Sequence, residues 1–129
     1  MASAVADYAP VKKSKVKIKK AKGELAVRLK STVDILAWAG KHKNQQRATS
    51  HKLRFIVGFA LEDRNLRKSA EKKLKEKKLD MIIANDCSSI GADEVSVQVK
   101  TTGGEWRTLP RAGKVTVARR IIALIERGG

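Results

Sequence analysis

Two apolar runs joined by a helix-like segment constrain the fold of this 129-residue chain most strongly. The run LRFIVGFALE (53–62) is too short for a typical helix and rich in β-branched and aromatic residues, which favours a buried parallel strand. The run DMIIAND (80–86) has the same character. Between them, residues 63–79 lack Gly and Pro and predict a helix that starts at Glu62 or Asp63. This order predicts a right-handed βαβ unit.

Downstream patterns predict the rest of an α/β domain. EVSVQVK (94–100) alternates in polarity, TTGG (101–104) is a turn, and residues 105–109 pair back as a hairpin. Residues 114–129 predict a last helix with a buried stripe of Val115, Ala118, Ile121, Ile122 and Ile125. We expect a Rossmann-like, three-layer αβα fold whose sheet is mainly parallel, with an added β-hairpin.

The N-terminal third has weaker signals. Residues 23–30 alternate, with Leu25, Val27 and Leu29 on one side, and predict a half-buried strand. Residues 31–43 predict a short helix that Gly40 ends, followed by a polar loop over 43–52. The chain starts abruptly with small apolar residues, so we expect it to be a fragment of a larger domain.

The composition is strongly basic. Lys and Arg number 29 against 13 Asp and Glu, and the net charge is +16. Such a surface favours nucleic acid, nucleotide phosphates, acidic metabolites or anionic lipid as partners. A single cysteine and no Cys/His metal spacing indicate a reducing cytoplasm, and no apolar run is long enough to span a membrane.

A lysine-rich segment near the N-terminus allows two interpretations. It is either a solvated basic tail or one wall of a phosphate site. In an extended segment Lys15, Lys17 and Lys19 lie on one face, and a disordered tail has no need of the alternating Val16 and Ile18. The lysines concerned are Lys12, Lys13, Lys15, Lys17, Lys19, Lys20 and Lys22.

Two further lysines lie on the helix predicted over 63–79. Its apolar stripe of Leu66, Ala70 and Leu74 is narrow, and Lys73 and Lys77 adjoin it at a spacing that places them on one face. They are either snorkelling side chains or a pair of phosphate-binding ammonium groups.

Ligands of open α/β sheets bind beyond the carboxyl ends of the strands. Gly58 and Phe59 of one predicted strand and Asn85 and Asp86 of the next are candidates for such contacts. Gly58 allows close approach of a ligand or another backbone. Phe59 either stacks on a base or belongs to the core.

Several segments, in this order, resemble one enzyme family. They are AVADYAP with VKIKK ten residues on, GELAVRL followed by DIL, IVGFALED, A-x-x-KL-x-x-KKLD, MIIAND and EVSV. Together they are similar to phosphopantothenoylcysteine synthetase (phosphopantothenate–cysteine ligase), also grouped with DNA/pantothenate metabolism flavoproteins. In many bacteria this ligase is fused to a flavin-dependent decarboxylase in coenzyme A biosynthesis.

The resemblance implies a ligase that uses CTP or ATP, with Mg²⁺, to activate 4′-phosphopantothenate as an acyl-nucleotidylate, which the amine of cysteine then attacks. It also implies a homodimer. It assigns Lys17 as the catalytic lysine, and the metal ligands stay unknown. The implied nucleotide contacts are Ser3, Asp7, Lys17, Val33, Asp34, Ile35, Leu36, Phe59, Lys73 and Lys77.

We expect residues 1–129 to correspond to the carboxy-terminal part of the ligase domain, without its upstream Rossmann-like half. Such a fragment alone is not necessarily active. Two other functions stay open, namely a basic nucleic-acid-binding module and a non-catalytic fragment that assembles with a partner. The first is disfavoured because the chain has no recognisable nucleic-acid motif and only 4% aromatic residues.

Overall fold

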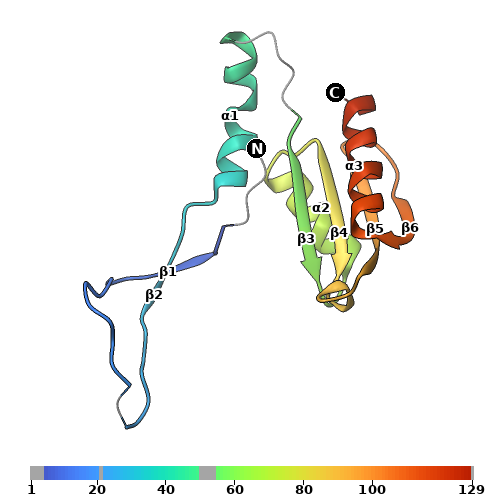
Figure 1. The fold of residues 1–129 in the computed structure, drawn as a ribbon. Helices are drawn as coiled ribbons and strands as arrows, with labels where there is room; N and C mark the ends of the chain where they lie inside the picture. Colours follow the sequence, from blue (N-terminus) through green and yellow to red (C-terminus); the bar gives the residue numbers. More distant parts are fainter. Residues whose placement is uncertain (1–4, 21, 50–54, 129) are drawn as a thin grey trace. The chain divides into compact units, whose positions relative to one another are not determined.

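The structure is a computed structural model that describes residues 5–20, 22–49 and 55–128 (Figure 1). The chain divides into two compact units, Met1–Ile35 and Leu36–Gly129. Each unit is described by itself.

The second unit is built on a four-stranded sheet in the order β3-β4-β5-β6. The parallel pair β3 and β4 aligns Val57 with Met81 at one end and Glu62 with Asp86 at the other. The pairs β4–β5 and β5–β6 are antiparallel, so the described sheet is mixed and its parallel part is limited to β3 and β4. The strands are β3 (Val57–Glu62), β4 (Met81–Asp86), β5 (Glu94–Thr101) and β6 (Arg107–Gly113).

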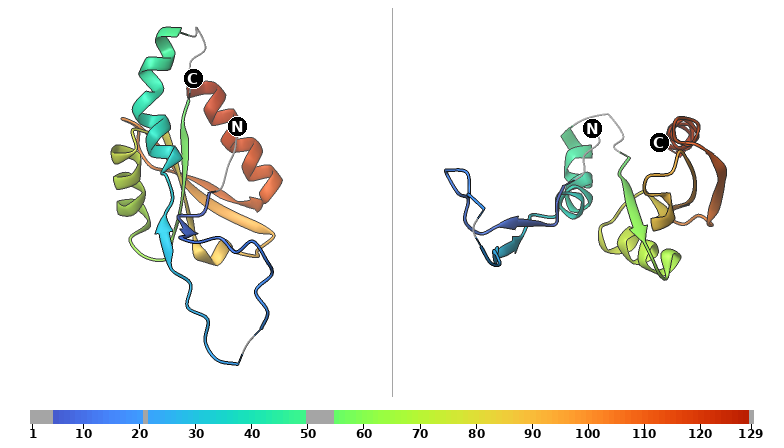
Figure 2. Two further views of the ribbon diagram at one scale, coloured as in Figure 1. Left: turned by 90° about the vertical axis from the view of Figure 1, so that its left-hand side faces the viewer. Right: turned by 60° about the horizontal axis from the view of Figure 1, so that its bottom comes forward.

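Helices cover both faces of this sheet, as the left view in Figure 2 shows for α2 (Leu66–Glu76) and α3 (Lys114–Gly128). Side chains of β4 alternate between the two layers because successive residues of a strand point to opposite faces. Ile82 and Ala84 pack in the cluster with α2, and Met81 and Ile83 pack in the cluster with α3. The α/β, Rossmann-like, three-layer class predicted from the sequence is therefore confirmed.

The helix predicted over 63–79 is shorter at both ends. Glu62 is the last residue of β3, since it pairs with Asp86 in the sheet. Asn65 is the N-cap of α2, in the left-handed region at φ 52°. At the other end Lys77 is the C-cap, and Lys78 at φ 51° turns the chain toward β4.

The expectation that Gly40 ends a helix is wrong. Helix α1 (Ile35–Thr49) runs through Gly40 and continues over most of the predicted polar loop, whose last residues lie outside the described ranges. Gly40 is buried, and a Cβ atom there would overlap the main-chain carbonyl oxygen of Lys77. The glycine therefore serves close packing of α1 and not its termination.

The buried stripe of α3 differs from the predicted one. Val117 is buried, and Ile121, Leu124 and Ile125 pack beside it. Val115 and Ile122 of the predicted stripe are 67% and 53% exposed, and Ala118 is also exposed. The sequence contains two overlapping apolar stripes, and the start of α3 directly after β6 decides which one faces the sheet.

The first unit contains a small antiparallel ribbon of β1 (Tyr8–Pro10) and β2 (Leu29–Ser31). The half-buried strand predicted over 23–30 is wrong: only its last two residues belong to β2. Leu25, Val27 and Leu29 are 69%, 55% and 55% exposed. A two-stranded ribbon has no second layer within its own unit against which such a face can pack.

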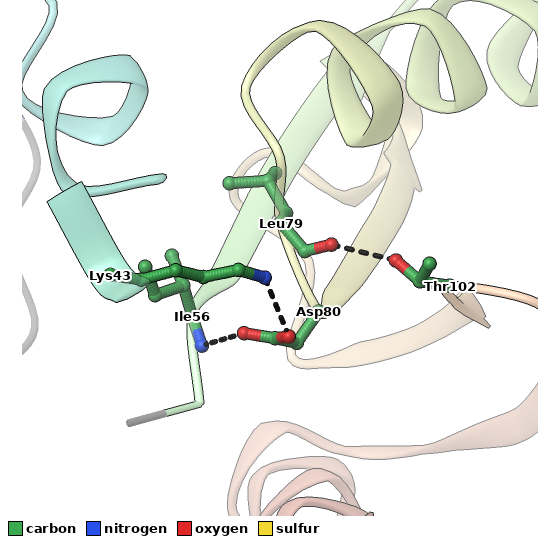
Figure 3. Close-up of polar contacts among 5 residues, drawn as sticks. All are labelled: Lys43, Ile56, Leu79, Asp80 and Thr102. Atoms are coloured by element: carbon green, nitrogen blue, oxygen red, sulfur yellow. Dashed lines mark hydrogen bonds and ion pairs between the residues drawn. The ribbon is translucent and has the colours of Figure 1, made fainter. Parts of the chain in front are cut away.

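The carboxylate of Asp80 joins several segments of the second unit at the base of β4 (Figure 3). One oxygen lies 2.9 Å from the ammonium of Lys43 on α1, and the other accepts the N–H of Ile56 at 2.9 Å, just before β3. The turn after β5 closes on the same place, because Thr102 donates its hydroxyl to the carbonyl of Leu79 at 2.7 Å. Asp80 thus holds together chain segments that are distant in sequence.

We predict that Asp80→Ala lowers the free energy of unfolding by about 2–3 kcal/mol, because the Ile56 N–H and the Lys43 ammonium both lose their acceptor. Lys43→Gln should cost about 1 kcal/mol, since it removes one partly exposed ion pair. Urea unfolding followed by circular dichroism measures both. The control is Lys41→Gln on the exposed side of α1, expected within about 0.5 kcal/mol of the unmodified chain. A loss for Asp80→Ala as small as that of the control would contradict this role.

Candidate nucleotide-binding site

In the first unit, the backbone brings two of the predicted nucleotide contacts together. The carbonyl of Asp7 accepts the N–H of Thr32 at 2.9 Å, and the hydroxyl of Thr32 donates to the carbonyl of Ala6 at 2.6 Å. Asp7 therefore lies beside the start of the segment Val33–Ile35, although Ala6 and Thr32 are 26 positions apart in the sequence. The side chains of Asp7, Val33 and Asp34 are exposed.

Lys17 lies in residues 11–20, which have no regular helix or strand and are all exposed. The apolar neighbours Val16 and Ile18 are 77% and 61% exposed, so they make no core in this unit. That Lys15, Lys17 and Lys19 share one face of an extended segment stays a prediction. Ser3 lies outside the described residues.

In the second unit, Leu36 packs on the core cluster that contains Ala60, Leu74 and Ile82. A Cβ atom on Gly58 would lie 3.3 Å from Leu36 and would overlap a methyl group of Leu79. The close approach that Gly58 permits is thus made by side chains of α1 and of the turn before β4. It places the first turn of α1 against the strand residue that precedes Phe59.

Phe59 is not a core residue. Gly58 and Ala60 contact the α2 layer, so the alternation of the strand turns Phe59 to the opposite face of the sheet. Its side chain is 68% exposed, and Leu61 on the same face is 50% exposed. The ring is therefore available for a ligand or for another part of a larger domain.

The ammonium of Lys73 already has a carboxylate partner. It lies 3.1 Å from an oxygen of Glu62, the last residue of β3, and both side chains are partly buried. This is the arrangement expected of a structural lysine, and a phosphate group would compete with Glu62 for the same ammonium. Lys77 is partly buried at the C-cap of α2, one turn further on. The predicted one-face spacing of these two lysines agrees with the observed helix.

The candidates at the end of β4 line a separate cavity of about 440 Å³. Asp86 accepts the backbone N–H of Ser88 at 2.7 Å, and hydrogen bonds from the backbone and side chain of Ser88 hold the pKa of Asp86 below its ordinary value. Arg111 of β6 also lines the cavity and pairs with Glu94 at 3.3 Å, a neighbour that the sequence pattern did not indicate. Leu36, Phe59, Lys73 and Lys77 are not among its lining residues, so this cavity is distinct from the nucleotide contacts predicted in the second unit.

Neither a metal centre nor a membrane span is found in the described ranges. No three His, Cys, Asp or Glu side chains of residues 5–20, 22–49 and 55–128 gather as a metal site requires. None of the described helices is both long and apolar enough to cross a bilayer.

Comparison with known proteins identifies the family. The model of the DNA/pantothenate metabolism flavoprotein C-terminal domain matches residues 1–127. The chain belongs to this family.

Curated relatives extend well beyond the region that matches this family member. The coenzyme A biosynthesis bifunctional protein CoaBC of Bacillus subtilis (strain 168) is 37% identical over 124 residues, covering 93% of this chain and 29% of that protein. A cysteine/cysteine sulfinic acid decarboxylase from an unknown prokaryotic organism is 35% identical over 134 residues, covering 98% of this chain and 35% of that protein. The chain thus spans about a third of the length of these relatives.

A solved structure supports the same fold. The crystal structure of the C-terminal domain of a coenzyme A biosynthesis bifunctional protein CoaBC superposes with a TM-score of 0.68 at 34% sequence identity. The match covers 97% of this chain and 50% of that one. The Rossmann-like fold of this family member is therefore that of part of a larger domain in its relative.

Proposed function

We propose that this chain is the nucleotide-binding part of a ligase that joins 4′-phosphopantothenate to cysteine in coenzyme A biosynthesis. The match of residues 1–127 to the family and the names of the CoaBC relatives support the pathway. The observation that supports the nucleotide assignment is that implied contacts far apart in sequence come close together within each unit. Asp7 lies beside Val33 in one unit, and Leu36 packs beside the strand that carries Phe59 in the other.

The proposed reaction has two steps. The carboxylate of 4′-phosphopantothenate attacks the α-phosphorus of CTP or ATP, and pyrophosphate leaves. The amine of cysteine then attacks the acyl carbon of the acyl-nucleotidylate, an amide bond forms, and the nucleoside monophosphate leaves as the amine loses a proton. Both steps depend mainly on positioning and on neutralising phosphate charge.

The basic side chains suit that task. In this proposal Lys17 stabilises the charge that develops on the triphosphate in the transition state, and Lys73 and Lys77 bind phosphate oxygens as ammonium groups. Mg²⁺ is expected to arrive with the nucleotide, because it prefers phosphate oxygens and water to a dedicated protein cage. The remaining lysines of residues 12–22 supply a positive field that attracts the triphosphate.

We further propose a cytoplasmic homodimer that is fused to, or associates with, a flavin-dependent decarboxylase. The bifunctional names of the CoaBC relatives support the fusion, since the matched region is only 29% of the Bacillus subtilis protein. The alternative proposal is that this chain catalyses the reaction only when it is assembled with the remaining part of the ligase domain.

Calorimetric titration with CTP, ATP and a short DNA duplex, in Mg²⁺ and at two salt concentrations, tests the function. Saturable one-to-one binding of one triphosphate would support the ligase site and identify its nucleotide. Nucleic-acid binding is the second candidate because of the net charge of +16. A steep loss of duplex affinity with salt, without preference among triphosphates, would favour that function and overturn the ligase proposal.

Lys17→Gln tests the assignment of the catalytic lysine. We expect it to weaken triphosphate affinity or turnover by about 10-fold or more, because a charge-assisted contact is lost at the phosphate chain. Lys12→Gln carries the same change of charge in the same exposed segment. It should lower triphosphate affinity or turnover by only about 2-fold, because it weakens only the long-range electrostatic attraction. Equal losses for the two variants would indicate a general polyanion-binding tail.

Glu62→Gln tests whether Lys73 binds phosphate. If the triphosphate competes with Glu62 for the Lys73 ammonium, removing the carboxylate should tighten triphosphate binding by roughly 3-fold or more. Glu105→Gln is the matched control, since it changes the net charge equally at an exposed residue outside the predicted contacts. Unchanged affinity with lower stability in Glu62→Gln would make Lys73 a structural lysine only.

A further inference from the structure

One face of α1 contacts β3, the C-terminal end of α2 and the turn that precedes β4. Leu36 packs against Gly58, Gly40 lies on the backbone at Lys77, and Lys43 pairs with Asp80. These α1 residues are spaced at i, i+4 and i+7, which places them in one row along the helix. Leu36 and Lys43, at the two ends of the row, make side-chain contacts. Gly40, at its centre, brings the backbone of α1 against the backbone at Lys77.

The central contact leaves no room for a side chain. A Cβ atom on Gly40 would overlap the carbonyl oxygen of Lys77 and would lie 3.4 Å from the carbonyl oxygen of Lys78. Both obstacles are main-chain atoms, which cannot rotate away as the end of a flexible side chain can. Those carbonyls lie in the turn directly after α2, where the N–H of Lys77 bonds to the carbonyl of Lys73 at 3.0 Å and that of Leu79 to the carbonyl of Leu74 at 3.0 Å.

We propose that Gly40 is a positioning residue of the nucleotide site. By letting α1 rest on the end of α2, it sets the separation between Leu36 and Lys77, two residues that the proposed function places on the nucleotide. The inference rests on that function. It adds a residue that touches no ligand and acts by setting the position of Lys77 relative to the first turn of α1.

Gly40 can affect both proposed contacts because it lies close to Leu36 and to Lys77. Leu36 is about one helical turn from Gly40, roughly 6 Å along the axis. A methyl group at Gly40 that moves α1 away from α2 therefore displaces Leu36 and Lys77 relative to each other by a similar amount. Where activity depends on exact geometry, displacing a contacting group by about 1 Å is enough to lower activity by up to about 100-fold.

Gly40→Ala tests the inference, with Gly113→Ala as the matched control, because a Cβ atom on Gly113 meets nothing within 4 Å. Triphosphate affinity is measured by calorimetry with CTP and ATP in Mg²⁺. Amide hydrogen exchange at Lys77, Lys78 and Leu79 is measured without nucleotide, against amides of β5 as an internal reference. We expect Gly40→Ala to weaken affinity by about 10-fold or more and to speed exchange at these three amides, and Gly113→Ala to do neither.

A double-mutant cycle separates positioning from general destabilisation. If Gly40 acts through Lys77, Gly40→Ala should add less than about 2-fold to the affinity loss of Lys77→Gln, whereas independent effects multiply. If Gly40→Ala does not fold, Lys43→Gln loosens the same row of contacts without a clash. It should then weaken triphosphate affinity in the same direction, by roughly 3-fold.

The outcomes distinguish this inference from the proposed function. If the unmodified chain binds triphosphate and Gly40→Ala binds as tightly as Gly113→Ala, the positioning role is wrong and the function stands. Multiplicative losses in the cycle with Lys77→Gln also overturn it. If the unmodified chain binds no triphosphate, the proposed function fails, and with it the assignment of Gly40 to a nucleotide site; hydrogen exchange then still decides whether Gly40 holds α1 on α2.

Discussion

Burial of β4 on both faces is the constraint on which the second unit depends. Its first four residues, Met81, Ile82, Ile83 and Ala84, are between 0% and 1% exposed. Through them α2 packs on one side and α3 on the other, while β3 and β5 pair along the two edges. A strand buried in this way must be apolar at every position, which is why its sequence shows no alternation.

Three acidic side chains connect separate segments of the second unit through ion pairs and hydrogen bonds. Asp80 joins Lys43 and the N–H of Ile56, Glu62 pairs with Lys73, and Glu71 accepts the indole N–H of Trp106 at 2.8 Å. Each of these contacts connects a helix or turn to a strand or to the segment beside it. Pairing part of the positive charge in this way stabilises the fold, and the chain still carries a net charge of +16.

Part of the candidate site was accessible from sequence, and part was not. The spacing of Lys73 and Lys77 predicts that they lie on one helix face, and the resemblance implies Asp7, Lys17 and Phe59 as nucleotide contacts. Spacing cannot reveal that Lys73 is already paired with Glu62, because the two residues meet only when α2 folds back on β3. Likewise, Gly40 was interpreted as a helix end, since a glycine in a helical pattern has the same appearance whether it ends the helix or permits a close contact.

The sequence by itself determined the βαβ core, the hairpin, the final helix and the family, because apolar runs, turn residues and ordered motifs are local properties of the chain. Only the tertiary structure decided that β4 pairs antiparallel with β5, that α3 buries Val117 and not Val115, and that residues 25–29 remain exposed. The reason is that strand partners and helix rotation are set by which surfaces meet. Two apolar stripes of similar strength cannot be ranked until the sheet shows which one it covers.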